Sequence, residues 1–228
     1  MFKACLATRR QASSAKGRSL ERGNATPYRN RVTPLGDIVA IPLRGAWTGN
    51  RGILHSGHDI VRFHGGDHWI TCALRFKGRH DEQWAPRRLT WLFFHDEAVS
   101  LAAGHRPCGE CRHRDYTAFR DAWPRENDAA PPTARQMNRR LHGERMIKGA
   151  RRRQLHELDW SDLPDGAFVV QDGTPALVTG PRLVEWGWGG YRNRRPRPAR
   201  GQATVITPPS TLAVLRAGYP VQIDESAR

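Results

Sequence analysis

Two cysteines stand at Cys-x2-Cys spacing in the segment Arg-Pro-Cys108-Gly-Glu-Cys111, and a His-x3-Cys pair, His68 and Cys72, lies upstream. Zinc prefers sulfur and imidazole donors, and a closed structural site takes four of them in a tetrahedron. A Cys-x2-Cys elbow brings two thiolates to one ion from a single turn, and a His-x3-Cys pair at a strand end supplies two more donors. We therefore expect a zinc site formed by His68, Cys72, Cys108 and Cys111.

Each of these ligands has a simpler alternative, as a small core residue for the cysteines or an exposed strand residue for His68. Other histidines compete for a place near the ion, and they are His64, His80, His105 and His113. His113 follows Cys111 too closely to share its ion comfortably. His105, just before the elbow, suits a position behind the ligands or facing solvent.

The number of cysteines also indicates the redox state of the cellular compartment in which the protein works. Four cysteines in 228 residues are too few for a disulfide framework, and a close pair of thiols is typical of metal binding in a reducing compartment. The fourth cysteine, Cys5, belongs to a basic N-terminal segment without the apolar core of a secretory signal. No stretch of about 18 apolar residues exists, so we expect a cytoplasmic protein without a membrane partner.

The net charge of +15 is concentrated in three blocks, residues 1–32, 135–153 and 182–200. These blocks hold 22 of the 37 basic residues and three of the 22 acidic ones. Concentrated cations attract phosphate backbones through charge and counterion release, which predicts a nucleic-acid partner. The alternative is a set of solvated arginine-rich loops in a chain biased toward arginine.

Two of the blocks supply specific candidates for nucleic-acid contacts. The first lies on an expected basic helix and its end, and its members are Arg139, Arg140, Arg145, Lys148, Arg151, Arg152 and Arg153. The second alternates aromatic and guanidinium groups on an expected flexible Gly-rich loop, and its members are Trp188, Tyr191, Arg192, Arg194, Arg195 and Arg197. Such a loop can stack an unpaired base and bind its phosphates. The alternative interpretation is that Trp186 and Trp188 are core residues and that the arginines form a solvated loop.

The elements that must position these residues follow from local signals. Residues 60–63 and 68–72 read as a β-hairpin with a Gly-Gly turn, and residues 89–94 as a further strand. A short helix over 96–103 has Asp96 as its N-cap and Gly104 as its left-handed end. Longer helical patterns cover 114–123 and 134–158. The C-terminal part predicts strands at 167–170, 176–179 and 204–207 and a helix at 211–217.

These elements predict an α+β fold in four parts. Residues 1–27 form a basic disordered tail, 28–125 a small zinc module of β-hairpin strands and short helices, 126–158 a basic helical segment, and 159–228 a β-rich C-terminal region.

Residues 93–111 resemble the zinc-binding N-terminal domain of the Ada DNA-repair methyltransferases. The shared features are an Ala-Ala-Gly run ending a short helix, here Leu101–Gly104, followed by Arg106-Pro-Cys108 and Cys111. The resemblance covers about residues 60–115 and implies a zinc cofactor, a partner that is DNA rather than RNA, and a role in DNA repair or processing.

The chain departs from that family at two points. His68 stands where the family has the cysteine that accepts a methyl group from DNA, and an imidazole on zinc is not an equivalent nucleophile, so that activity does not carry over to it. Cys72 is the alternative acceptor, as a zinc-bound thiolate. The segment between the two ligand pairs is also longer here, by an insertion near 77–88.

Two other functions stay open beside nucleic-acid binding. One is a metal-dependent nuclease or other phosphodiester hydrolase with a structural zinc, for which acid–base candidates are His142 with Glu144, and His156 with Glu157, Asp159 and Asp162. Surface polar residues beside a basic helix explain the same pattern. The other is a zinc-stabilised module that binds an acidic protein.

Overall fold

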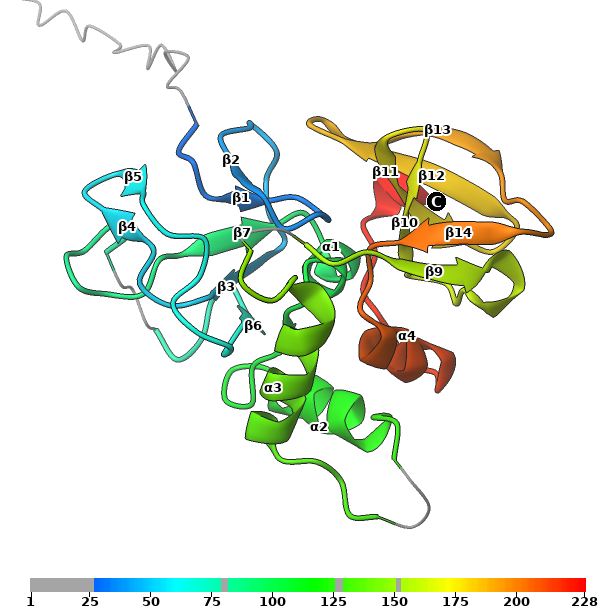
Figure 1. Ribbon diagram of the computed structural model, residues 1–228. Helices are drawn as coiled ribbons and strands as arrows, with labels where there is room; N and C mark the ends of the chain where they lie inside the picture. Colours follow the sequence, from blue (N-terminus) through cyan, green and yellow to red (C-terminus); the bar gives the residue numbers. More distant parts are fainter. Residues whose placement is uncertain (1–26, 79–81, 126–128, 151–152) are drawn as a thin grey trace, which may run out of the picture.

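Two β-sheets lie on either side of the short helix α1 in the computed structural model, which describes residues 27–78, 82–125, 129–150 and 153–228 (Figure 1). Helices α2 and α3 lie against the N-terminal sheet, and α4 lies beside the C-terminal sheet. The protein is therefore of mixed α+β class, as the sequence predicts.

The N-terminal sheet has six short strands in the order β2-β1-β7-β3-β6-β8. Their bounds are Ile38–Val39 (β2), Arg31–Val32 (β1), Leu92–Phe94 (β7), Trp47–Asn50 (β3), Ile70–Cys72 (β6) and Arg106–Pro107 (β8). Strand β3 approaches β6 so closely that a Cβ on Gly49 would lie 2.1 Å from the carbonyl oxygen of Ile70. Only glycine fits there, and the antiparallel register pairs Thr48 with Cys72.

The expected hairpin of residues 60–63 with 68–72 is wrong. Strand β4 (His55–Ser56) pairs with β5 (Asp59–Ile60) in a separate two-stranded sheet, and β6 pairs instead with β3 and, in parallel, with β8. The Gly-Gly turn is used differently, because Gly65 donates its N–H to the carbonyl of Arg51 and lies against Gly52.

Helix α1 (Glu97–Ala102) forms where the sequence predicts it. The Asp96 carboxylate accepts the Val99 N–H at 2.8 Å, which satisfies one of the free donors of the first turn. Gly104, at φ +84°, ends the helix in the left-handed conformation. All six residues of α1 are buried, because the helix packs against both sheets.

The remaining helices pack around Leu101 of α1. They are α2 (His113–Asp121), α3 (Ala134–Arg145) and α4 (Pro209–Arg216), and their apolar faces share one core with Leu101. The helix expected over 134–158 begins with a capping box at Thr133 but ends at Arg145. Residues His156–Asp159 form strand β9 instead.

The C-terminal sheet has six strands in the order β13-β12-β11-β10-β14-β9, all antiparallel to their neighbours. Besides β9, their bounds are Phe168–Gln171 (β10), Thr174–Thr179 (β11), Arg182–Gly187 (β12), Gly190–Pro196 (β13) and Gln202–Val205 (β14). The expected Gly-rich loop near Trp186 is wrong, because this segment forms the hairpin of β12 and β13. Two single turns of 3₁₀-helix, Trp160–Asp162 and Glu225–Ala227, complete the fold.

One hydrophobic cluster joins the two sheets. It combines Ala98, Val99 and Ala102 of α1 with Phe168 and Trp186 of the C-terminal sheet, and Val39 of β2 packs against it. Among the described residues, no helix has the length and apolar character needed to cross a lipid bilayer.

Candidate metal centre

The elbow that carries Cys108 and Cys111 connects β8 to α2. Cys108 donates its backbone N–H to the Thr71 carbonyl at 2.9 Å, which continues the parallel pairing of β8 with β6. The Arg112 N–H then closes the turn onto the Cys108 carbonyl at 3.2 Å. This geometry places the elbow beside Cys72 at the end of β6.

The sulfur atoms of Cys72, Cys108 and Cys111 all lie within 4.8 Å of one another. Tetrahedral zinc holds thiolates at about 2.3 Å, which places them about 3.8 Å apart, so this spacing fits the ion. Two backbone N–H groups already point at the sulfurs at 3.4 Å, from Glu110 to Cys108 and from Ala73 to Cys111. Such donors stabilise thiolates, and the three cysteines therefore form a set suited to a soft metal ion.

Without a bound metal, the three thiols have different pKa values. The hydrogen bond from Cys72 lowers the pKa of the Cys108 thiol to about 5. The same bond, with burial, raises the pKa of Cys72, and burial raises that of Cys111. A metal dication would displace the remaining thiol protons, so metal binding couples to proton release.

His68 lies outside this group. It precedes β6 with an exposed side chain, whereas the next residue, Trp69, is fully buried. The other histidines lie elsewhere: His105 is buried and accepts the Arg51 Nε–H at 3.2 Å, and His113 is exposed with Nδ1 3.0 Å from the Gly109 carbonyl. His105 therefore does not face solvent, and His80 lies outside the described residues.

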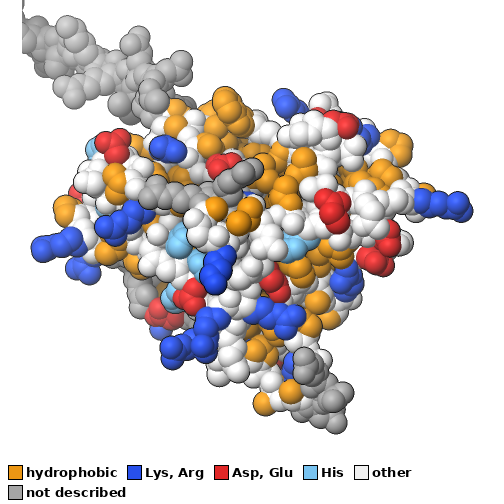
Figure 2. All heavy atoms as spheres, in the orientation of Figure 1, with side chains coloured by type: hydrophobic (Ala, Val, Ile, Leu, Met, Phe, Trp, Pro, Cys, Tyr) orange, Lys and Arg blue, Asp and Glu red, His pale blue; other side chains and the backbone are white. Residues whose placement is uncertain are grey.

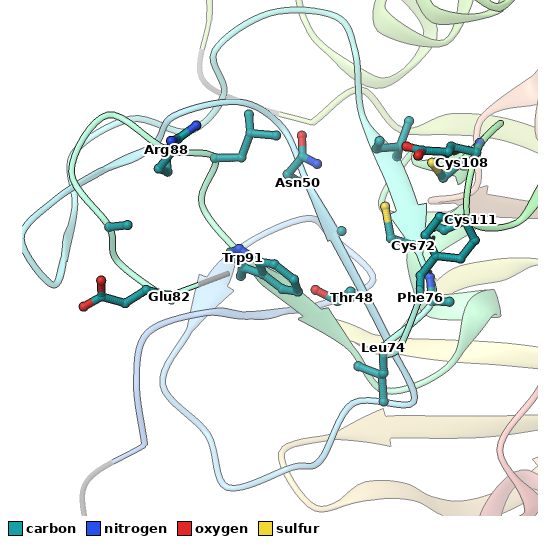
Figure 3. Close-up of a pocket in the computed structure, with 16 residues that line it drawn as sticks. Thr48, Asn50, Cys72, Leu74, Phe76, Glu82, Arg88, Trp91, Cys108 and Cys111 are labelled. Atoms are coloured by element: carbon teal, nitrogen blue, oxygen red, sulfur yellow. Dashed lines mark hydrogen bonds between the residues drawn. The ribbon is translucent and has the colours of Figure 1, made fainter. Parts of the chain in front are cut away.

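A pocket of about 450 Å³ opens beside the sulfurs (Figure 3). Cys72, Cys108 and Cys111 form one wall, and Trp91, Arg88 and Glu82 stand on the loop opposite. Thr48 and Asn50 of β3 lie between these walls, and Leu74 and Phe76 follow Cys72. The thiols are thus reachable from a partly open space of mixed aromatic and polar character.

The loop of residues 82–91 is held in place by Trp84. Its ring, 8% exposed, packs against Tyr28, His55 and His58 at centroid distances of 5.4–5.9 Å. Trp84 and Arg87 both have positive φ, at 70° and 61°, as does Lys77 at 49° on the other side of the pocket. Three of the five such non-glycine residues in the described chain therefore flank this pocket, and strained backbone concentrates at functional sites.

A buried ion pair supports the elbow from behind. Arg112, which follows Cys111 directly, places Nη2 2.6 Å from the Glu97 carboxylate and its guanidinium 3.8 Å from the Trp47 ring. The same carboxylate accepts the Tyr219 hydroxyl at 2.7 Å and the Gln222 N–H at 3.0 Å. The elbow is therefore tied to α1 and to the C-terminal segment.

The first basic block divides into exposed and buried residues. Arg139, Arg140 and Lys148 are exposed, whereas Arg145 is 1% exposed and donates to the carbonyls of Gly104 and Asp67. Arg153 donates to three carbonyls, those of Ala102, Ala103 and Ile206. Arg145 and Arg153 thus satisfy carbonyls around the end of α1, and Arg151 and Arg152 lie outside the described residues.

The second basic block lies on β13 and the tip before it. Trp188 is 71% exposed and Arg192 is exposed, but Tyr191 is buried and donates its hydroxyl to Asp96 at 2.7 Å. Other arginines contact the protein itself: Arg195 pairs with Asp172 and Glu185, Arg194 donates to the carbonyls of Ser226 and Arg228, and Arg197 donates to that of Trp160.

The acid–base candidates also take part in internal contacts. His156 donates to the Glu144 carbonyl at 2.8 Å, and the Glu144 carboxylate accepts the N–H and hydroxyl of Ser210. His142 accepts from Arg145 at 3.3 Å. Within the described ranges, the only group of three or more metal-ligating side chains is the cysteine cluster.

Sequence reasoning missed the opposite wall of the pocket. Arg88 and Trp91 lie opposite the cysteines, and no local sequence pattern marks them as site residues. In comparisons with known proteins, no family model, curated protein or solved structure matches this chain.

Proposed function

We propose that this chain is a zinc-thiolate protein that binds nucleic acid at the mouth of the cysteine pocket, with DNA preferred over RNA and a role in DNA repair or processing. The observation that carries the proposal is the combination of cations and aromatic rings around that pocket. Arg88 lines it, beside the acids Glu82 and Glu110. Arg75, Lys77 and Arg87 are exposed on the two segments that border it, residues 73–78 and 82–91. Glu82 is the only acid among the described residues of 73–91.

This arrangement matches the two parts of a nucleotide. Exposed guanidinium and ammonium groups suit phosphate oxygens, and arginine can bind them with two parallel hydrogen bonds. Half-buried Trp91 and Phe76 offer ring faces on which an unpaired base can stack. A volume of 450 Å³ lies within the range of about 300–1,000 Å³ usual for small-ligand pockets, so one nucleotide is of suitable size.

The charged surface extends beyond the pocket. Figure 2 shows Lys and Arg side chains projecting over the β4–β5 side of the N-terminal sheet and over α3, with acidic groups between them. Arg145, Arg153 and Arg195 are occupied by internal contacts, whereas the exposed cations near the pocket and on α3 remain available to phosphates.

Zinc is the ion that we propose for the three cysteines. An all-thiolate donor set selects soft or borderline ions, among which zinc has no redox chemistry and accepts tetrahedral geometry readily. Cys72, Cys108 and Cys111 would hold it, joining the end of β6 to the elbow. Elemental analysis of protein purified without added metal should give about one zinc per chain, and Cys108→Ser should abolish it.

The nucleic-acid proposal is tested by fluorescence anisotropy with single-stranded and duplex DNA and with RNA of the same sequence, at several salt concentrations. Binding should weaken steeply with salt, with a slope of about 0.7 per phosphate contact on single strands. Arg87→Ala/Arg88→Ala should reduce that slope by about 1.4. Arg139→Ala/Arg140→Ala measures the contribution of α3.

The matched control is Arg182→Ala/Arg200→Ala, which removes the same charge from two exposed positions in the C-terminal region. It should bind like the unchanged protein. Equal losses in the pocket and control variants would indicate a response to net charge alone. No salt-dependent binding to any of the three nucleic acids would refute the proposal and favour the acidic-protein partner.

A further inference from the structure

We infer that the metal centre is open: three cysteines hold the ion, and its fourth position faces the 450 Å³ pocket, where water or a donor atom of a ligand occupies it. This goes beyond a closed structural site, since an ion with three protein ligands and an exchangeable fourth can bind and activate a ligand. The inference rests on the metal binding proposed above but not on nucleic-acid binding.

The position of the sulfurs relative to the pocket is the first support. All three cysteines line it, and Cys72 and Cys111 are only half-buried. Figure 3 shows the cysteines together on one wall, with open space between them and the loop that carries Trp91. An ion bound to three sulfurs on one wall directs its remaining coordination position away from them, and the pocket lies beside them.

The second support is that the described residues provide no fourth ligand in the cysteine group. Among the described residues, the group that can hold an ion contains only the three cysteines. His68 is the expected fourth ligand, but neither of its ring nitrogens belongs to the group of ligand atoms that lie within 4.8 Å of one another. Its side chain is exposed.

Trp69, the neighbour of His68, is firmly held. The buried Trp69 ring has the guanidinium groups of Arg51 and Arg145 at 4.2 and 3.9 Å, and its indole N–H donates to the Gly66 carbonyl at 2.8 Å. The Trp69 carbonyl in turn accepts the Arg106 N–H. These contacts fix the backbone on the C-terminal side of His68.

The pocket also holds the groups that an exchangeable ligand needs. Asn50 supplies a hydrogen-bonding side chain, and Arg88 supplies a cation. Three thiolates on a dication leave the centre with one negative charge, which disfavours hard anions at the fourth position. A neutral nitrogen donor, or a thiol that binds as its soft thiolate and releases its proton to solvent, is therefore the chemical class that we assign to the ligand.

The test uses the full chain loaded with cobalt(II), whose visible d–d bands report coordination number and ligand type. Metal content is measured first, so that failure to load counts against the proposed function and not against the open position. Adding imidazole, or separately 2-mercaptoethanol, should change the bands in a saturable way. Bands that do not respond to either probe would overturn the inference.

Substitutions then locate the open position. His68→Ala, His113→Ala and Cys5→Ser should leave the cobalt spectrum unchanged, and a changed spectrum in any of them would identify a protein-supplied fourth ligand and contradict an open centre.

Leu74→Trp narrows the pocket and should weaken imidazole binding about tenfold, or about 1.4 kcal/mol, with cobalt content unchanged. Leu155→Trp, at an exposed leucine that does not line the pocket, is the control and should bind imidazole normally. Equal imidazole binding by the two tryptophan variants would place the exchangeable position away from this pocket.

Discussion

Replacing Glu97 with glutamine tests whether the buried ion pair behind the elbow holds the metal centre in place. Glu97 and Arg112 have side chains only 2% and 3% exposed, and their contact is 2.6 Å. The Glu97 carboxylate accepts from three donors: Arg112, the Tyr219 hydroxyl and the Gln222 N–H. A glutamine amide has one acceptor oxygen, so its NH₂ group must face another donor.

The expected loss follows from these contacts. Breaking a buried ion pair costs about 3–5 kcal/mol because the partner is left charged and uncompensated. Asp115 still lies 2.7 Å from Arg112 and offsets part of that charge. We therefore expect Glu97→Gln to lower the free energy of unfolding by about 3 kcal/mol. In a chain of this size this corresponds to a fall of roughly 6–12 °C in Tm.

Urea denaturation of the metal-free and zinc-loaded proteins measures this loss. Asp115→Asn is the control, because Asp115 is 41% exposed and a surface pair contributes less than about 1 kcal/mol. Adding Arg112→Met to Glu97→Gln should restore part of the stability, since the uncompensated charge is then gone. A loss below about 1 kcal/mol for Glu97→Gln alone would refute the reasoning.

Three further predictions concern the metal, a close backbone approach and a surface carboxylate. Zinc affinity should fall about 100-fold per pH unit on acidification from neutral pH, because Cys72 and Cys111, whose pKa values are raised, each release a proton on binding. Competition with a chromogenic chelator measures the affinity, and an affinity independent of pH would contradict the prediction. Gly49→Ala should destabilise the protein by more than about 2 kcal/mol because its Cβ meets the Ile70 carbonyl, whereas Gly143→Ala, in the open on α3, should stabilise it by about 0.5–1 kcal/mol; equal thermal shifts would contradict the close approach. The hydrogen bond from Arg195 lowers the pKa of Asp172. The contribution of this pair to folding stability is therefore complete above the ordinary aspartate pKa and is lost as pH falls through the lowered value. Arg195→Ala should raise the pKa of Asp172 in an NMR titration, and an unchanged value would show that the pair does not form.

The parts of this molecule that sequence predicts well are those fixed by neighbouring residues. Asp96 and Gly104 mark the two ends of α1 through their own backbone and side-chain preferences. The Cys-x2-Cys elbow brings Cys108 and Cys111 together by spacing alone, and the upstream pair supplies Cys72 as the third sulfur.

The parts that sequence does not predict depend on contacts between distant segments. Arg145 looks like one more cation on a basic helix, but it is buried because the carbonyl of Gly104, 41 residues away, needs a donor. The wall opposite the cysteines is placed by Trp84, whose ring fits among aromatic residues of a separate hairpin. Neither interaction leaves a periodic pattern in the chain.

The attachment of α1 to the end of the chain has a consequence for the order of events during synthesis. The carboxylates of Asp96 and Glu97 accept hydrogen bonds from the backbone N–H groups of Asp224 and Gln222, respectively. Glu97 also holds Arg112 beside the elbow. The elbow is translated near the middle of the chain, whereas its support comes from residues made more than a hundred positions later. We expect the cysteines to acquire their metal only after residues 222–224 have been synthesised, because until then the nascent elbow lacks the contacts that fix it.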